Sequence, residues 1–190
     1  MILEGIVTTL DDDGRLNIAP MGPIVTPELT TLILRPFQTS TTYRNLKTRR
    51  CGVFHVVDDV LLIARAALNQ LSQEPTTFVA SSIAGRVLED CCRWFEFEVD
   101  RIDDSQDRTR LEARVVHAGR KRDFFGFNRA RHAVLEATIL ATRLHILAED
   151  EVRAELSRLE PLVQKTAGEQ EQIAWELVCR YVDDWFAARA

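Results

Sequence analysis

The chain has 190 residues, of which 46% are apolar and 28% are charged, and this composition excludes a disordered protein. A net charge of −5 and the lack of an apolar run long enough to cross a bilayer argue against nucleic-acid and membrane partners. Four cysteines, two of them adjacent, do not form a disulfide framework, so we expect a reduced, cytoplasmic protein.

The N-terminal third predicts β structure. The run "GIVTTL" is apolar and β-branched, "DDDG" is a turn in which Gly14 is free to take a positive φ, and "RLNIAPMGPIV" is extended again, so a hairpin is expected. Pro20, Gly22 and Pro23 interrupt its second strand and make that strand irregular or place it at an edge. A third strand follows at "ELTTLILRPF". A fourth, "RRCGVFHVVDD", is apolar enough to be buried on both faces.

A helix capped by Asp58 or Asp59 is expected at "DDVLLIARAALNQL". The run "RWFEFEVDRI" then alternates apolar and acidic residues, which predicts a strand with Glu96, Glu98 and Asp100 on its polar face. It forms a second hairpin with "RLEARVVHAG". The segment "DDSQDR" is the turn between these two strands. Residues 72–92, between the predicted helix and this hairpin, give no clear pattern.

The last third changes to helical spacing. One helix is predicted in "FNRARHAVLEATILATRLHIL", a second starts near Glu149 and is interrupted by Pro161, and a third is "AGEQEQIAWELVCRYVDDWFAARA". About six antiparallel strands predict a small barrel, because closure removes exposed strand edges. The expected domains are a barrel over residues 1–125 and a helical extension over residues 126–190 that packs on the barrel or on a dimer partner.

The segment "RPFQTSTTYRNL" has two interpretations. Hydroxyl side chains before a helix cap its free N–H groups, and one hydroxyl is enough for that. The same N–H groups also bind phosphate, and four hydroxyls beside Arg35 exceed what a cap needs. Residues 35–50 carry five basic side chains and no acidic one, which favours an anion site or a solvated basic helix face. The two interpretations are compatible.

The interrupted strand "NIAPMGP" also has two interpretations. A strand broken by Pro20 and Gly22 exposes backbone donors and acceptors with which a flat heterocycle could pair, and Gly22 would allow its close approach. A simple kink in an edge strand explains the same residues equally well.

Three stretches, "GIVTTLDDDGRLNIAPMGPI", "LRPFQTSTTYRNLKTRRCGVFHVVDDVLLIARAAL" and "FFGFNRARHAVLEATILATRL", resemble an uncharacterised family of the flavin-reductase-like, FMN-binding split-barrel superfamily. The resemblance covers roughly residues 2–147. It implies a mainly β fold, namely a six-stranded antiparallel split β-barrel with an inserted helix and a C-terminal helical extension. It also implies a homodimer with FMN bound near the subunit interface.

The resemblance assigns two groups of residues to FMN. The phosphate group would be held by Arg35, Thr39, Ser40 and Thr42. The isoalloxazine ring would be lined by Asn17, Ala19, Pro20, Met21 and Gly22, with Phe37 and Tyr43 as further neighbours of the ring or the ribityl chain.

These residues favour a flavin-dependent oxidoreductase that uses a small-molecule electron donor or acceptor, either a nicotinamide or a reduced deazaflavin. The chemistry would be that of the flavin, and no general acid or base of the chain is identified. The alternative is a carrier or sensor that binds FMN, or another phosphorylated ligand, without turnover.

The remaining polar features are less specific. Asn128 is a candidate N-cap for the helix that follows "FGFN". Arginines in the first turn of this helix oppose its dipole, which indicates either an anion partner or a salt bridge across a dimer. His55 is interpreted as a hydrogen-bonded core histidine, and the pairs of His and Glu four residues apart as helix-surface pairs rather than metal ligands. Of Cys91 and Cys92, at most one should be buried if the segment is extended.

Overall fold

The computed structural model describes residues 1–189 and divides the chain into two compact units. The first unit consists of residues 1–57 and 74–124, and the second of residues 58–73 and the chain from 125 onward. None of the helices in the described part of the chain combines the length and the apolar character that crossing a membrane requires.

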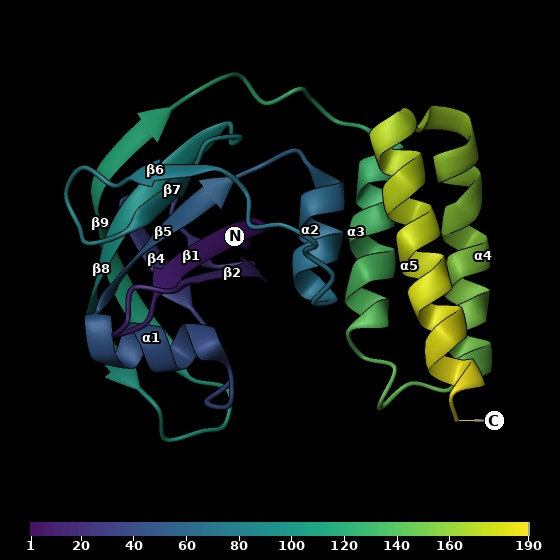
Figure 1. The fold of residues 1–190 in the computed structure, drawn as a ribbon, viewed down its shortest axis with the longest axis horizontal. Helices are drawn as coiled ribbons and strands as arrows, with labels where there is room; N and C mark the ends of the chain where they lie inside the picture. Colours follow the sequence, from purple (N-terminus) through teal and green to yellow (C-terminus); the bar gives the residue numbers. More distant parts are fainter. Residues whose placement is uncertain (190) are drawn as a thin grey trace. The chain divides into compact units, whose positions relative to one another are not determined.

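The first unit is built on a curled antiparallel half-barrel sheet in the order β2–β1–β5–β8–β9–β4–β3 (Figure 1). Its strands are β1 (Gly5–Leu10), β2 (Leu16–Met21), β3 (Ile24–Val25), β4 (Thr31–Leu34), β5 (Cys51–Val56), β8 (Arg93–Asp103) and β9 (Arg110–Arg120). A separate two-stranded sheet pairs β6 (Thr77–Val79) with β7 (Arg86–Leu88).

The mainly β class with helices is confirmed, but the predicted number of six strands is wrong, because the main sheet has seven. The sequence "LNIAPMGPIV" forms two strands instead of one. After Gly22 and Pro23 the chain leaves β1, and Ile24 and Val25 pair with β4 on the far side of the sheet order. β2 and β3 are thus the two edges, as the prolines had indicated for the second strand.

The apolar face of the curled sheet holds the core of the first unit. Phe54, Phe95 and Phe97 lie at its centre with almost no exposed surface. Helix α1 (Thr41–Arg49) lies across one end of the sheet (Figure 1) and adds Tyr43 and Leu46 to the same cluster. Burial of each such side chain contributes roughly 1.5–3 kcal/mol, so these contacts hold α1 against the sheet.

Glu96 was predicted on a polar, solvent-facing side of its strand, and this is wrong. Its side chain is fully buried and accepts hydrogen bonds from the backbone N–H groups of Ser81 (2.8 Å) and Ser82 (2.6 Å) and from Nε1 of Trp94 (3.3 Å). A buried carboxylate is tolerated only when such donors satisfy it. Glu96 therefore anchors the β6–β7 connection onto the outer face of β8.

Cys91 and Cys92 are both buried, contrary to the expectation that at most one would be. The expectation assumed an extended strand, whereas these residues lie before β8 begins, and the Cys92 N–H donates to the carbonyl of Val56. Burial raises the pKa of the Cys91 thiol to about 11, which makes Cys91 a poor nucleophile at neutral pH.

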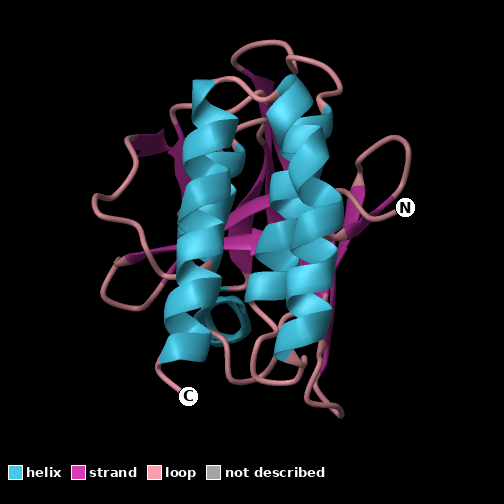
Figure 2. Cartoon of the chain, turned by 90° about the vertical axis from the view of Figure 1, so that its right-hand side faces the viewer, coloured by secondary structure: helices cyan, strands magenta, loops and turns pink. Residues whose placement is uncertain are grey.

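The second unit is helical. It consists of α2 (Val60–Ala67), α3 (Arg129–Ala141), α4 (Glu149–Thr166) and α5 (Glu169–Ala187), and Figure 2 shows its long helices side by side. The apolar face of α5, with Trp175, Val178 and Val182, is buried against α2 and α3. The predicted interruption at Pro161 is wrong, since α4 continues through it on an exposed face.

His55 joins three strands. Its Nδ1 lies 3.2 Å from the carbonyl oxygen of Ile6 in β1, and its Nε2 accepts the N–H of Leu88 in β7 at 3.1 Å. The prediction of a hydrogen-bonded core histidine is confirmed. Because Nε2 is an acceptor, the ring is neutral with its proton on Nδ1. Burial lowers the pKa of His55 from 6.5 to about 4, and the bond to Ile6 offsets only part of that effect.

The lowered pKa makes the stability of the first unit depend on pH. The unfolded chain binds a proton at His55 below about pH 6.5 and the folded chain only below about pH 4, so the free energy of unfolding should fall as pH falls through this window. The loss from this residue should reach about 3 kcal/mol. Denaturant unfolding between pH 7 and 4 measures it.

His55→Gln should be less stable at pH 7 and should lack this loss, so its stability should approach that of the wild type as pH falls. His145→Gln, at an exposed position, serves as the control and should follow the wild type. Parallel curves for His55→Gln and the wild type would show that His55 does not titrate in this way.

Candidate functional site

The segment between β4 and α1 has a well-defined cap. Ser40 is the N-cap of α1, and its hydroxyl accepts the N–H of Tyr43 at 3.1 Å and donates to the carbonyl of Phe37 at 2.7 Å. The capping interpretation is therefore correct for Ser40. The N–H groups of Thr41 and Thr42 have no partner within the helix, as at any helix start.

Thr42 and Asn17 are far apart in sequence and meet in the structure. Nδ2 of Asn17, in β2, donates to Oγ1 of Thr42 at 3.0 Å and to Oγ1 of Thr9 at 3.2 Å. Nδ2 of Asn45 donates to the same Thr9 oxygen at 3.0 Å. One residue assigned to the phosphate and one assigned to the ring are thus joined directly, and the first turn of α1 is fixed to the start of β2.

Arg35 follows β4 and is half-buried. Its Nε is buried and has no hydrogen-bond partner among the described residues. The next residue is held firmly, because the carbonyl of Pro36 accepts both the N–H (3.0 Å) and the hydroxyl (2.7 Å) of Thr109. A buried guanidinium N–H without an acceptor is costly, so Arg35 is suited to an acceptor that is not part of this chain.

Phe37 and Thr39 lie on the exposed side of the same segment. The Phe37 ring lies 5.8 Å from the guanidinium of Arg108, and the two residues also pair through their backbones. The carbonyl of Thr39 accepts a hydrogen bond from Arg44 at 2.8 Å. Two arginines, Arg44 and Arg108, are therefore held close to this segment, and Arg108 comes from a loop that the sequence indicated only as a turn.

The hydroxyl of Tyr43 makes its hydrogen bonds with groups inside the first unit. Its hydroxyl donates to Oδ2 of Asp104 at 2.6 Å, and Nζ of Lys47 donates to both groups, at 3.0 Å and 2.9 Å. The hydrogen bond from Tyr43 and then that from Lys47 lower the pKa of Asp104. These bonds tie α1 to the loop between β8 and β9.

The residues assigned to the ring lie on β2 and just after it. Asn17, Ala19, Pro20, Met21 and Gly22 are all half-buried. The residues up to Met21 pair with β1 on one side, and the other side of β2 is an edge of the main sheet. An edge strand leaves part of its backbone donors and acceptors without a ladder partner, as a planar ligand with donors of its own would require.

Gly22 is explained by packing within the chain. A side chain at this position would meet the Glu4 carboxylate at 2.6 Å and the Ile2 side chain at 2.7 Å. The space beside the Gly22 Cα is therefore filled on that side by residues preceding β1, and a ligand would have to approach from the opposite side.

The arginine at the start of α3 finds its anions within the second unit. Nε of Arg131 donates to Oε1 of Glu171 at 2.8 Å, and its Nη1 lies 3.7 Å from Oδ2 of Asp58. Burial alone would raise the pKa of Glu171, but the hydrogen bond from Arg131 leaves it below the usual range. Arg131 thus has two carboxylate partners among the described residues, although its buried Nη1 makes no hydrogen bond there. The predicted N-cap, Asn128, is confirmed.

The fold of this chain is similar to that of flavin-reductase-like proteins of known structure. The flavin reductase of the styrene monooxygenase from Pseudomonas putida superposes with a TM-score of 0.53 at 13% identity, over 64% of this chain and 82% of that one. Component B of the nitrilotriacetate monooxygenase from Bacillus cereus gives a TM-score of 0.52 at 19% identity, over 62% and 69% of the two chains.

The chain belongs to the family of proteins of unknown function DUF447. The model of the family's N-terminal domain matches residues 3–122, and a second model of the family matches residues 128–180. The predicted membership of an uncharacterised family with a flavin-reductase-like fold is confirmed. A crystal structure of an FMN-bound protein of this family from Methanosarcina mazei is 26% identical, with a TM-score of 0.81, over 95% of this chain and 94% of that one. No curated protein matches the sequence.

Proposed function

We propose that this chain binds FMN on its first unit, with the phosphate at Arg35 and the start of α1 and the isoalloxazine ring along β2. The observation that carries the proposal is the buried Nε of Arg35, which has no acceptor in the described chain. The FMN-bound relative from the same family, which spans nearly the whole chain, supports the choice of ligand.

The phosphate end of the proposed site combines two kinds of donor. Arg35 offers a permanently charged, forked donor, and the free N–H groups of Thr41 and Thr42 point out of the helix start with the positive end of its dipole. The hydroxyl of Ser40 caps the helix and its N–H donates to the carbonyl of Phe37, so Ser40 would act by fixing the helix start rather than by touching the phosphate. The hydroxyl of Thr42 accepts from Asn17, so Thr42 could donate to the phosphate through its N–H and through the proton of its hydroxyl. Thr39, whose side chain is exposed, would offer its hydroxyl.

Replacement of Arg35 tests this site. Arg35→Gln keeps a side chain of similar length and removes the charge, so the loss of a charge-assisted hydrogen bond should weaken FMN binding about 10- to 100-fold. Riboflavin, which lacks the phosphate, should bind the variant and the wild type with similar affinity. Quenching of flavin fluorescence on titration measures all four affinities.

Arg15→Gln is the matched control, since Arg15 lies at an exposed turn and pairs with Asp13. It should leave the affinity for FMN unchanged. If Arg35→Gln weakened FMN and riboflavin equally, the phosphate would not lie at Arg35.

We further propose that the bound flavin turns over, in an oxidoreductase of the flavin-reductase-like type. The support for turnover is the shared fold. The flavin would supply the hydride or electron transfer, and this chain would orient the ring and exclude water from it. The alternative is a carrier or sensor that holds FMN, or another phosphorylated ligand, without turnover. Both share the same binding site, so reduction kinetics must separate them.

Anaerobic mixing of the FMN-loaded protein with a reduced donor separates the two. NADH, NADPH and a reduced deazaflavin should be tried in turn, and an oxidoreductase should bleach the flavin absorption band within seconds with at least one of them. Free FMN at the same concentration is the control for direct reduction. Bleaching no faster than that control with all three donors would favour the carrier or sensor.

We also propose that the protein is a homodimer. The feature that supports this is the exposed aromatic pair Phe125 and Phe127, which are 81% and 94% accessible in the single chain. Large exposed aromatic side chains in one short segment usually mark an interaction surface.

Light scattering on a sizing column tests the dimer. The wild type should have twice the mass of one chain, and the double variant Phe125→Ser with Phe127→Ser should shift toward a monomer because the apolar contact is lost. Ile146→Ser, at another exposed apolar position, is the control. A wild-type protein that stays monomeric at high concentration would rule the dimer out.

A further inference from the structure

A cavity of about 500 Å³ lies where β5 and β9 end and β8 begins. This is the end of the curled sheet away from α1, as Figure 1 shows for the end of β9. The cavity is lined by three arginines (Arg93, Arg120 and Arg122), by one acidic residue (Asp123), and by Cys92, Gly119 and the apolar residues Val56, Ala118 and Phe124.

Two of these arginines face each other directly. Arg93 and Arg120 are cross-strand partners in the β8–β9 register, and both line the cavity. Like charges directly opposite on neighbouring strands repel each other. Within residues 1–189, no carboxylate lies within ion-pair distance of Arg93, whose guanidinium lies 5.0 Å from the centre of the Phe95 ring. An anion between Arg93 and Arg120 would relieve this repulsion.

The other charges at this end leave Arg93 and Arg120 able to bind a ligand. Arg120 pairs with Asp123, but both side chains are largely exposed, and such pairs contribute little. Arg122 is held in place, because it donates to Sγ of Cys92 at 3.2 Å and to Oδ1 of Asp90 at 3.0 Å.

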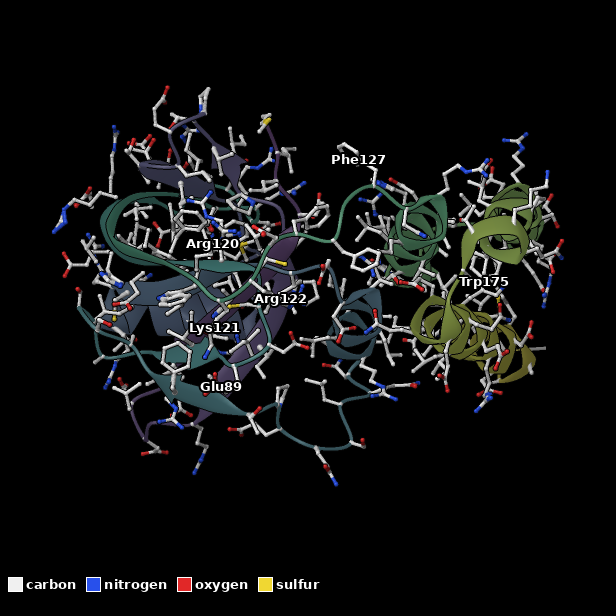
Figure 3. The ribbon with its side chains drawn as sticks, turned by 90° about the horizontal axis from the view of Figure 1, so that it is seen from above. Glu89, Arg120, Lys121, Arg122, Phe127 and Trp175 are labelled. Carbon is white, nitrogen blue, oxygen red and sulfur yellow. The ribbon has the colours of Figure 1, made fainter. Side chains whose placement is uncertain are left out.

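Figure 3 looks onto this end and shows Arg120, Lys121 and Arg122 in succession at the end of β9, with Glu89 beside Lys121. Nζ of Lys121 lies 2.5 Å from Oε2 of Glu89 and 4.9 Å from the centre of the Phe78 ring, and Lys121 is not among the residues that line the cavity. Of the basic groups at this end, Arg93 and Arg120 are therefore the pair that an incoming anion would meet.

The floor of the cavity indicates what the anion is attached to. Val56, Ala118 and Phe124 present apolar surface beside the guanidinium groups. An inorganic ion would leave that apolar surface exposed to water, whereas an organic acid with an apolar body would cover it. The volume is in the range of small-molecule sites.

We propose that Arg93 and Arg120 together bind the acidic group of a small organic acid, a carboxylate or a phosphate monoester, whose apolar body lies against Val56, Ala118 and Phe124. Two planar guanidinium groups match such an anion through paired hydrogen bonds. The site goes beyond the proposed FMN binding and does not depend on it.

The proposed phosphate site and the cavity lie at opposite ends of the β8–β9 hairpin, whereas the proposed ring residues Pro20 and Met21 lie at the same end of the sheet as the cavity. Pro36 and Gln38, next to the proposed phosphate site, bond to the loop between β8 and β9. Arg93 and Arg120 lie at the other end of these strands, each of which has 11 residues. At about 3.3 Å per residue, the two ends are on the order of 30 Å apart.

Calorimetric titration tests the proposal, with benzoate, 2-naphthoate and phenyl phosphate as probes. At least one should bind saturably, to FMN-free and FMN-loaded protein alike, and its neutral alcohol analogue should bind at least about tenfold more weakly. Arg93→Gln and Arg120→Gln should each lower the affinity by about tenfold or more. Arg35→Gln and Arg15→Gln should leave it unchanged, which separates this site from the flavin site.

Thermal unfolding without any ligand gives a second readout. Arg93→Gln and Arg120→Gln should each melt at the wild-type temperature or above it, because each removes one of the two repelling charges. A bound probe should raise the melting temperature of the wild type and not that of either variant. Failure of all three probes to bind, equal binding of the neutral analogues, or full affinity in both variants would overturn the proposal. So would competition by FMN, since the cavity would then belong to the flavin site.

Discussion

The hydroxyl of Thr9 accepts hydrogen bonds from two amide side chains, Asn17 of β2 and Asn45 of α1, and Asn17 reaches on to Thr42. Polar groups buried in this way must keep their partners, so the network allows only one arrangement of β1, β2 and α1. This hydrogen-bond network sets the distance between the two parts of the proposed flavin site. The start of α1 would bind the phosphate and β2 would lie along the ring, and neither can shift without breaking bonds to the other.

Much of the fold could be predicted from local patterns in the sequence. The β1–β2 hairpin, the buried strand β5, the β8–β9 hairpin and the caps at Ser40 and Asn128 follow from alternation, turn residues and capping residues nearby in the chain. The features that could not be predicted depend on contacts with segments that are distant in sequence. β3 leaves β1 for β4, and Glu96 is buried because the β6–β7 connection supplies its donors. No local pattern reports either fact.

The candidate site divides in the same way. The hydroxyl cluster and Arg35 lie close together in sequence, so the sequence alone could indicate them as a candidate phosphate site, and the unpartnered Nε of Arg35 supports that proposal. Arg108 and Asp104, which contact this segment, come from a loop with only a turn pattern. Gly22 was predicted to allow the close approach of a ring, but Glu4 and Ile2 already fill the space on one side of it. The paired arginines of the second cavity carry no sequence signal, since 27 positions separate Arg93 from Arg120.

The second unit is assembled from two stretches of chain that the whole of β6 to β9 separates. Helix α2 carries Val60, Ala64 and Leu68, and the side chains that bury them come from α3 and α5. During synthesis α2 therefore leaves the ribosome with its apolar face exposed to water. That face stays exposed until α3 and α5, near the end of the chain, have been synthesised. Expression of the segment matched by the N-terminal family model alone, residues 3–122, would leave α2 permanently in that state. A fragment cut at that boundary would be prone to aggregate, whatever the stability of its sheet.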